Sequence, residues 1–135
     1  MASTIHLELV TPEHSVLSED VDEVIIPGYE GEFGVLPGHT QYLSIVKIGV
    51  LRYRKGTEWF KVALGGGVAE VTPERGVVVL ADTAERAGEI DLERARRAKE
   101  RAEEALKKDL SVEDETYEKA SGAMQRAIAR ISVRE

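Results

Sequence analysis

The chain has 135 residues, of which 42% are hydrophobic and 32% charged, and its formal net charge at pH 7 is −7. This length suits one domain with an appendage, and the acidic balance argues against a general nucleic-acid-binding protein, which would usually be basic. The absence of Cys excludes disulfides and thiolate metal sites. No apolar run approaches the roughly 18 residues that a membrane helix needs, and we expect no signal peptide.

The first part of the chain, up to about Thr83, has the pattern of short β-strands. Ile5, Leu7 and Leu9 alternate with polar residues, which gives one apolar and one polar face. Further β-branched runs, separated by turn signals such as Pro–Gly, occupy residues 24–26, 43–46, 50–51, 62–64 and 77–80. Many short strands predict a sandwich or a flattened barrel. Parallel βαβ units are not expected, because no helical crossover separates the strands.

The second part changes to helical spacing from Asp91, which is well placed as an N-cap. The apolar stripe of a first helix consists mostly of alanines: Leu92, Ala95, Ala98, Ala102 and Ala105. A second helix is expected after Ser111, with the stripe Tyr117, Ala120, Met124, Ala127 and Ile131. We therefore predict an α+β fold with a β-domain at 1–84 and an antiparallel two-helix hairpin at 85–135. Alanine buries little area, at about 25 cal/mol per Å², so the hairpin should be marginally held.

No catalytic or metal-binding group can be assigned from the motifs. Gly65-Gly66-Gly67 lacks the Lys-Ser/Thr of a P-loop, which favours a turn or a close backbone contact. The three histidines, His6, His14 and His39, are scattered without the spacing of metal ligands. No Ser has the flanking residues of a nucleophile elbow. An enzyme is therefore the weakest hypothesis.

Two pairs of arginines have helical spacing. Arg94 and Arg101 are seven residues apart on the first helix, and Arg126 and Arg130 are four apart on the second. In a closed hairpin they could converge on an anion such as phosphate. The alternative is that each arginine pairs with a nearby carboxylate, and these are Glu93, Glu100, Glu103 and Glu104. The residues alone slightly favour this second interpretation.

Longer motifs resemble one known family over essentially the whole chain. They are Leu-Val-Thr-Pro at 9–12, Glu-Gly-Glu-Phe-Gly-Val-Leu-Pro-Gly-His at 30–39, Gly-Gly-Val-Ala-Glu-Val at 66–71 and Val-Leu-Ala-Asp-Thr-Ala-Glu-Arg at 79–86. Together they resemble the ε subunit of bacterial F-type ATP synthases. The resemblance implies an N-terminal antiparallel β-sandwich of about ten strands followed by the helical hairpin. It also implies a peripheral, non-catalytic rotor subunit on the cytoplasmic face of the bacterial inner membrane.

The resemblance further implies partners and their contact residues. The segment Glu30, Gly31 and Glu32 resembles the part of the family that faces the c-ring, and His39 lies in the region that faces the γ subunit. In this family the hairpin either folds against the sandwich or extends into the α/β catalytic head, where it blocks ATP hydrolysis. Basic Arg134 would join Arg126 and Arg130 in contacting acidic surfaces of the head.

The resemblance also implies a regulatory ligand, although no cofactor is required. Some family members bind ATP in the folded hairpin through the motif Ile/Leu-Asp-x-x-Arg-Ala, which matches residues 90–95 here. The implied ATP site comprises Glu85, Ile90, Asp91, Arg94, Arg101, Arg126 and Arg130. The resemblance therefore favours a phosphate-binding role for the four arginines over pairing with nearby carboxylates. Two alternatives stay open: a structural connector with an unresponsive hairpin, and a free-standing nucleotide sensor.

Overall fold

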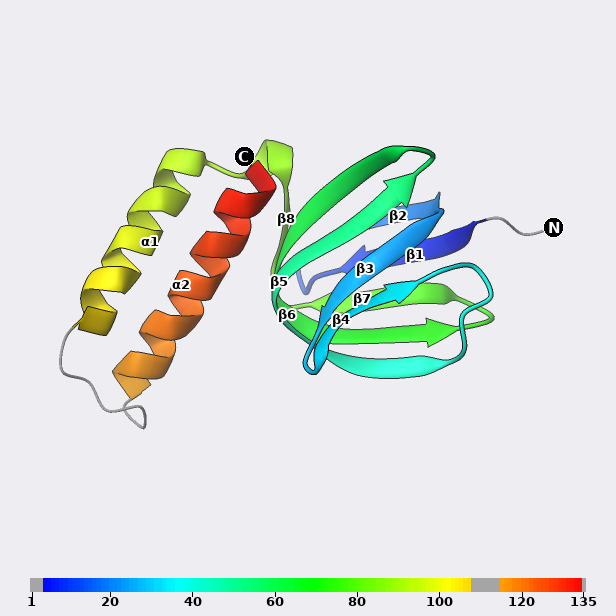
Figure 1. Ribbon diagram of the computed structural model, residues 1–135, viewed down its shortest axis with the longest axis horizontal. Coiled ribbons are helices and arrows are strands. Elements are labelled where there is room, and N and C mark those ends of the chain that lie inside the picture. The colour runs from blue at the N-terminus through cyan, green and yellow to red at the C-terminus, as the bar shows by residue number, and fades with distance from the viewer. Residues whose placement is uncertain (1–3, 108–114, 135) are drawn as a thin grey trace.

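The computed structural model describes residues 4–107 and 115–134. A β-sandwich is followed by two helices that lie together on one side of it (Figure 1). The strands are β1 (Ile5–Val10), β2 (Ser15–Val21), β3 (Glu23–Gly28), β4 (Gly31–Val35), β5 (Tyr42–Lys55), β6 (Glu58–Thr72), β7 (Gly76–Ala81) and β8 (Ala84–Arg86). A short 3-10 helix, η1 (Ala87–Glu89), leads into α1 (Leu92–Lys107) and α2 (Glu115–Arg134). The predicted α+β class is confirmed.

The described residues form eight strands, rather than the expected ten or so, because two strands are long and continuous. β5 has 14 residues and β6 has 15, and they pair antiparallel from Tyr42↔Val71 to Lys55↔Glu58. The apolar runs at 43–46 and 50–51 therefore belong to one strand. In Figure 1 both strands bend on the side nearest the helices and continue through both layers of the sandwich.

One pair of strands departs from the expected antiparallel arrangement. The order in the sheet is β2-β1-β7-β6-β5-β3-β4, and β8 pairs with β6. β1 is antiparallel to β2 but parallel to β7, with the register Leu7↔Val77 to Val10↔Leu80. A parallel pair needs a long connection, and here the five intervening strands supply it in place of a helix. The other strand pairs are antiparallel.

The core lies between the two layers and follows the predicted alternation. Leu7 and Leu9 are fully buried, whereas His6 on the opposite face of β1 is exposed. Tyr53 is 1% exposed and stacks on Phe60 with 5.0 Å between ring centroids. Burying one large apolar side chain stabilises the fold by about 1.5–3 kcal/mol. This core is therefore a more stable unit than the alanine-lined hairpin.

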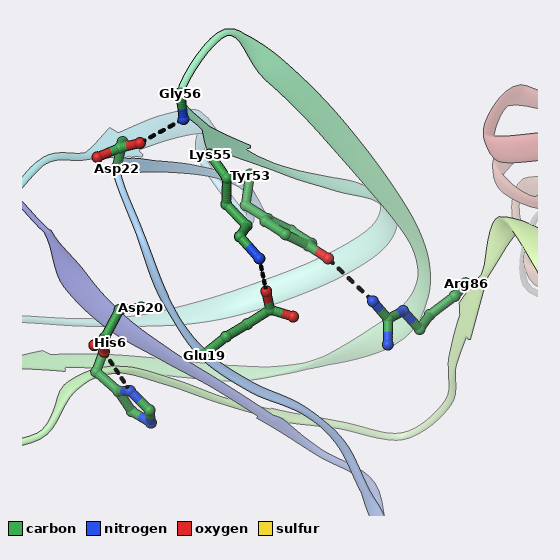
Figure 2. Close-up of polar contacts among 8 residues, drawn as sticks. All are labelled: His6, Glu19, Asp20, Asp22, Tyr53, Lys55, Gly56 and Arg86. Carbon is green, nitrogen blue, oxygen red and sulfur yellow. Dashed lines mark hydrogen bonds and ion pairs between the residues drawn. The ribbon is translucent and has the colours of Figure 1, made fainter.

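Polar contacts join β2 and the turn that follows it to the end of β5 (Figure 2). Lys55 Nζ lies 2.6 Å from Glu19 Oε1, and the Gly56 N–H donates to Asp22 Oδ2 over 2.6 Å. Each contact bridges segments more than 30 residues apart in the chain. They hold the end of β5 against the opposite part of the sandwich.

The run Gly65-Gly66-Gly67 lies inside β6 rather than in a turn. Gly67 has φ +151°, and a Cβ there would lie 2.0 Å from the carbonyl oxygen of Leu80 on β7. At Gly65 a Cβ would lie 2.1 Å from Thr83 Oγ1. Of the two predicted roles, the close backbone contact is confirmed and the turn is wrong. The glycines let the end of β7 and the residues that follow it approach β6 closely.

The two helices pack on each other, and α2 lies between α1 and the sandwich (Figure 1). Asp91 is the predicted N-cap of α1, since its Oδ1 accepts from the Arg94 N–H over 3.1 Å. The buried residues of this helix pair are mostly alanines, including Ala102 and Ala127. Ser111, the expected cap of the second helix, lies outside the described residues.

α2 also has a second buried face, which the sequence analysis missed. Ala129 and Val133 form a small cluster with Ala63 of β6 and Ile90 of the link to α1. This cluster is separate from the sandwich core. Of the stripe predicted for α2, Ala120 and Ala127 are buried. The additional face at Ala129 and Val133 packs α2 on the sandwich.

Candidate functional site

A cavity of about 480 Å³ lies between α1 and the edge of the sandwich. The β1–β2 turn, the segment from Thr83 to β8, and the link from η1 to α1 form its sandwich side. Both helices complete it. Its lining residues are Thr11, Glu13, His14, Thr83, Ala84, Glu85, Glu89, Ile90, Asp91, Arg94, Ala95, Ala98, Arg101 and Arg130.

Six of the seven residues expected at an ATP site line this one cavity. They are Glu85, Ile90, Asp91, Arg94, Arg101 and Arg130. Arg126 is the exception, because its guanidinium lies over Gly122, with Nη1 3.2 Å from the position of a Cβ there. Gly122 weakens the helix by about 1 kcal/mol relative to Ala, and its missing side chain makes room for the Arg126 guanidinium.

Of the three arginines that line the cavity, Arg130 forms an ion pair and the other two do not. Arg130 Nε forms a short contact with Glu85 Oε1, which links α2 to β8. Within residues 4–107 and 115–134, the side chains of Arg94 and Arg101 have no ion-pair or hydrogen-bond partner. Both are exposed on the cavity side of α1. Two unpaired guanidinium groups that face one cavity are suited to binding an anion.

Three of the four carboxylates that could have neutralised these arginines pair with other cations, and no contact joins Glu100 to either arginine among the described residues. Glu93 contacts Arg96 at 3.4 Å, and Glu103 contacts Lys99 at 3.7 Å. Glu104 contacts Lys107 at 3.8 Å. The interpretation that neighbouring glutamates pair with Arg94 and Arg101 is therefore wrong.

The rest of the lining is chemically mixed. Ile90, which is buried, contributes apolar surface to the lining, as do the small side chains of Ala95 and Ala98. Glu85 and Asp91 offer carboxylate oxygens that accept hydrogen bonds. Apolar surface, acceptor groups and free guanidinium groups together can hold a ligand that has a flat polar ring and a negatively charged tail.

The predicted c-ring segment forms the β3–β4 turn. Gly28 pairs with Gly31, so Tyr29 and Glu30 occupy the tip. Gly31 has φ +133°, which favours glycine. Tyr29 is 72% exposed. Glu32 lies one residue beyond the turn and accepts from Arg52 Nη2 at 3.0 and 3.2 Å.

The residue predicted to contact γ, His39, lies in the loop between β4 and β5. The backbone N–H of His39 donates to the Leu36 carbonyl over 3.1 Å. The ring Nδ1 lies 2.7 Å from the Thr40 carbonyl oxygen. The loop is therefore a hydrogen-bonded turn that holds the His39 ring against its own backbone.

An exposed apolar strip on the outer face of the sheet was not predicted. Ile45 on β5 pairs with Val68 on β6, which pairs with Leu80 on β7. Their exposed fractions are 62%, 41% and 56%, and Leu43 extends the strip along β5. The signal was present in the sequence, because apolar residues occupy both alternating sets of positions in these strands. The sequence analysis predicts strands at these runs but assigns no exposed apolar face to them.

No helix among the described residues is long and apolar enough to cross a membrane. Over the same residues, no three His, Asp or Glu side chains gather as they would around a metal ion.

Comparison with known families accounts for both parts of the chain. The family model for the β-sandwich domain of the ATP synthase delta/epsilon chain matches residues 4–87. The model for the long α-helix domain of the same chain matches residues 89–135. The chain belongs to the ATP synthase delta/epsilon chain family. The resemblance stated from the motifs is thereby confirmed.

Relatives in the family are similar over nearly their full length. The "ATP synthase epsilon chain" of Syntrophobacter fumaroxidans is 53% identical over 135 residues, which cover 100% of this chain and 98% of the relative. The protein of the same name from Geobacter metallireducens is 50% identical over 98% of this chain and 95% of its own.

Solved structures share the fold. A chain in the OSCP/F1/c-ring part of the Euglena gracilis mitochondrial ATP synthase superposes with a TM-score of 0.84 at 25% identity, covering 100% of this chain and 84% of that one. A chain in the central stalk and c-ring of the Tetrahymena thermophila mitochondrial ATP synthase superposes with a TM-score of 0.62 at 14% identity, covering 96% of both. At 14% identity the second match supports the fold alone.

Proposed function

We propose that this chain is a non-catalytic subunit of the F1Fo ATP synthase central stalk, which couples rotation of the c-ring to the F1 head through γ. The observation that carries the proposal is the ordered match of both family domains over almost the whole chain. The superposition on a chain from an F1/c-ring assembly supports it. The catalytic sites lie on other subunits, and this subunit sits peripherally at the cytoplasmic face of the bacterial inner membrane.

The γ subunit is the proposed partner of the exposed apolar strip. Ile45, Val68 and Leu80 form a continuous row across three neighbouring strands. Contiguous apolar surface of this kind marks sites of protein association. His39, in the loop that leads into β5, is proposed to contact γ at the border of the strip.

The β3–β4 turn is proposed to face the c-ring. It projects Tyr29 and Glu30 at a tip closed by Gly28 and Gly31. Glu32 carries the same charge but is already paired with Arg52. Together Glu30, Gly31 and Glu32 offer an acidic contact for polar loops of the ring.

The hairpin is proposed as the regulatory element, with a folded state and a state extended into the α/β head. Two features support this: the alanine-lined helix pair, and the small cluster by which α2 meets the sandwich. Because that cluster is separate from the core, α2 can leave without unpacking the sandwich. In the extended state Arg126, Arg130 and Arg134 would contact the head and inhibit ATP hydrolysis.

The inhibitory role can be tested on the reconstituted complex. Deletion of all residues after Gly88 should leave assembly with γ and the c-ring intact and raise the rate of ATP hydrolysis. The point variant Leu80→Glu, on the exposed apolar strip, is the control for assembly. It keeps the hairpin but should weaken binding to γ. Unchanged hydrolysis by a fully assembled deletion variant would favour a structural connector with an unresponsive hairpin.

ATP is proposed as a regulatory ligand of the cavity. Adenine would lie on Ile90 with its amino group toward a carboxylate, and the phosphates would face Arg94, Arg101 and Arg130. A ligand that binds only the folded hairpin stabilises it by RT ln(1 + [ATP]/Kd), about 2.7 kcal/mol at 100 times Kd. Falling ATP would then release the hairpin.

The ligand proposal is tested by titrating the full chain with ATP. Arg101→Ala should weaken binding at least tenfold, because charge-assisted hydrogen bonds to phosphate are lost. Arg126→Ala should have a smaller effect, since Arg126 lies outside the cavity lining in the folded hairpin. Absence of binding at millimolar ATP would remove the nucleotide role and leave the rotor role standing.

A further inference from the structure

We infer that His14 is a ligand contact of this cavity, supplied by the sandwich and opposed to the arginines of α1. The inference rests on the proposed nucleotide role of the cavity. It adds a residue that neither the sequence motifs nor the arginine spacing indicated. Through it, a bound nucleotide would join α1 directly to the β1–β2 turn.

The turn that carries His14 has a fixed conformation. The Thr11 N–H donates to the His14 carbonyl over 3.0 Å, and the Thr11 hydroxyl lies 3.3 Å from the same oxygen. The His14 N–H lies 3.4 Å from the Thr11 hydroxyl oxygen. Thr11 itself is buried. His14 is therefore held on the cavity wall by a buried anchor three residues before it.

The His14 ring also differs from the other two histidine rings. His6 contacts Asp20 Oδ1 at 2.9 Å and Ser18 Oγ at 3.1 Å, and His39 contacts the Thr40 carbonyl at 2.7 Å. In the part of the chain that the structure describes, the His14 ring has no hydrogen-bond partner. The one histidine whose ring is left unpaired there is the one that lines the cavity.

The placement of the charges explains what His14 would add. Arg94 and Arg101 lie on α1, whereas the sandwich wall carries the acidic Glu13 and Glu85. His14 is the basic residue that the sandwich wall contributes to the lining. An imidazole N–H can donate to a ribose or phosphate oxygen on the side of the ligand that the arginines of α1 do not reach.

This contact bears on how the hairpin is held. α1 packs mainly on α2, and it is α2 that packs on β5 and β6. The cavity is lined by α1 on one side and by the β1–β2 turn and the segment from Thr83 to Asp91 on the other, and Arg130 of α2 completes it. A nucleotide bound by His14 on one side and by Arg101 on the other would bridge the cavity and hold the folded hairpin on two sides.

The test uses the ring signals of the three histidines in the NMR spectrum of the full chain during an ATP titration. The His14 signals should shift and saturate with the affinity measured by calorimetry, while those of His6 and His39 stay in place. His14→Ala should raise the Kd for ATP about 2- to 10-fold, as expected for the loss of one hydrogen bond. His14→Gln, which keeps a donor, should recover most of the affinity, and His6→Ala, on the exposed face of β1, should bind as the parent chain does.

The outcomes separate the two proposals. If ATP binds and Arg101→Ala weakens it, but the His14 signals stay in place and His14→Ala binds normally, the role of His14 is overturned and the nucleotide site stands. If the parent chain binds no ATP at millimolar concentration, the nucleotide site is overturned and the His14 contact with it.

Discussion

The guanidinium of Arg86 donates a hydrogen bond over 3.3 Å to the phenolic oxygen of Tyr53, a core residue that is 1% exposed (Figure 2). Arg86 is the last residue of β8 and directly precedes η1. Its own N–H donates to Glu89 Oε1 over 2.9 Å. The segment that leads to the hairpin is thus held by two hydrogen bonds of Arg86. Its side chain contacts Tyr53 in the sandwich core, and its backbone N–H contacts Glu89 in η1.

Tyr53 should make stability fall at alkaline pH. Burial raises the pKa of Tyr53 above 10.0, and the nearby Arg86 partly opposes this shift. The native state therefore favours the neutral phenol, and its contribution to stability is present in full below about pH 10. That contribution is lost as pH rises through the native pKa. In Tyr53→Phe, the free energy of unfolding measured by urea denaturation should fall less steeply above about pH 10, by up to about 1.4 kcal/mol per pH unit. Parallel curves would contradict the assignment.

The close contact at Gly67 predicts a large difference between two glycine variants. Gly67→Ala should destabilise the sandwich by more than about 3 kcal/mol, because a Cβ would collide with the Leu80 carbonyl and the backbone φ disfavours it. Gly34→Ala is the matched control, since its Cβ would have only one neighbour, 4.0 Å away. Chemical denaturation of both variants measures the difference. Equal stabilities would show that β6 and β7 can separate at no cost.

The second face of α2 predicts that one buried charge releases the hairpin. Ala129→Asp would place an unpaired carboxylate in the apolar cluster with Val133 and Ile90, which costs several kcal/mol. Gln125→Asp adds the same charge at an exposed position of α2 and should leave the hairpin folded. Energy transfer between dyes on α1 and on the sandwich reports the separation. The strand signal in circular dichroism should stay constant in both variants, and its loss in Ala129→Asp would mean that the sandwich depends on the hairpin.

The contact between Glu85 and Arg130 should stabilise the folded hairpin by about 1 kcal/mol in the absence of ligand. Both side chains are about one-third exposed, so solvent weakens the attraction. A double-mutant cycle of Glu85→Gln and Arg130→Gln, read by denaturation, measures the coupling. It should shrink as salt is added. Strictly additive effects would mean that the pair contributes nothing measurable to stability.

The sequence predicted features that depend on local spacing. The alternation of Leu7 and Leu9 identified the buried face of β1, and Asp91 was recognisable as a cap from its position before an apolar stripe. Arg94 and Arg101 fall on the same side of α1 because seven residues make two helical turns. Each of these inferences needs only neighbouring residues, which is why local patterns suffice.

Features that depend on distant segments were not predictable in this way. The parallel pairing of Leu7 with Val77 joins positions 70 residues apart, and no local pattern encodes it. Ala129 and Val133 are buried by Ala63 and Ile90, which belong to other elements. The separate positions of Arg126 and Arg130 depend on side-chain direction, which residue spacing does not determine.

The placement of β1 between β2 and β7 has a consequence for biosynthesis. β1 is made first, but one of its two edges stays unpaired until β7, ending at Ala81, has left the ribosome. Because chains emerge at about 5–20 residues per second, that edge is exposed for several seconds in every nascent chain. Long-range pairing of this kind is also slow to form. A chaperone that binds nascent chains should therefore protect the β1 edge, and a truncated chain that ends before β7 should aggregate.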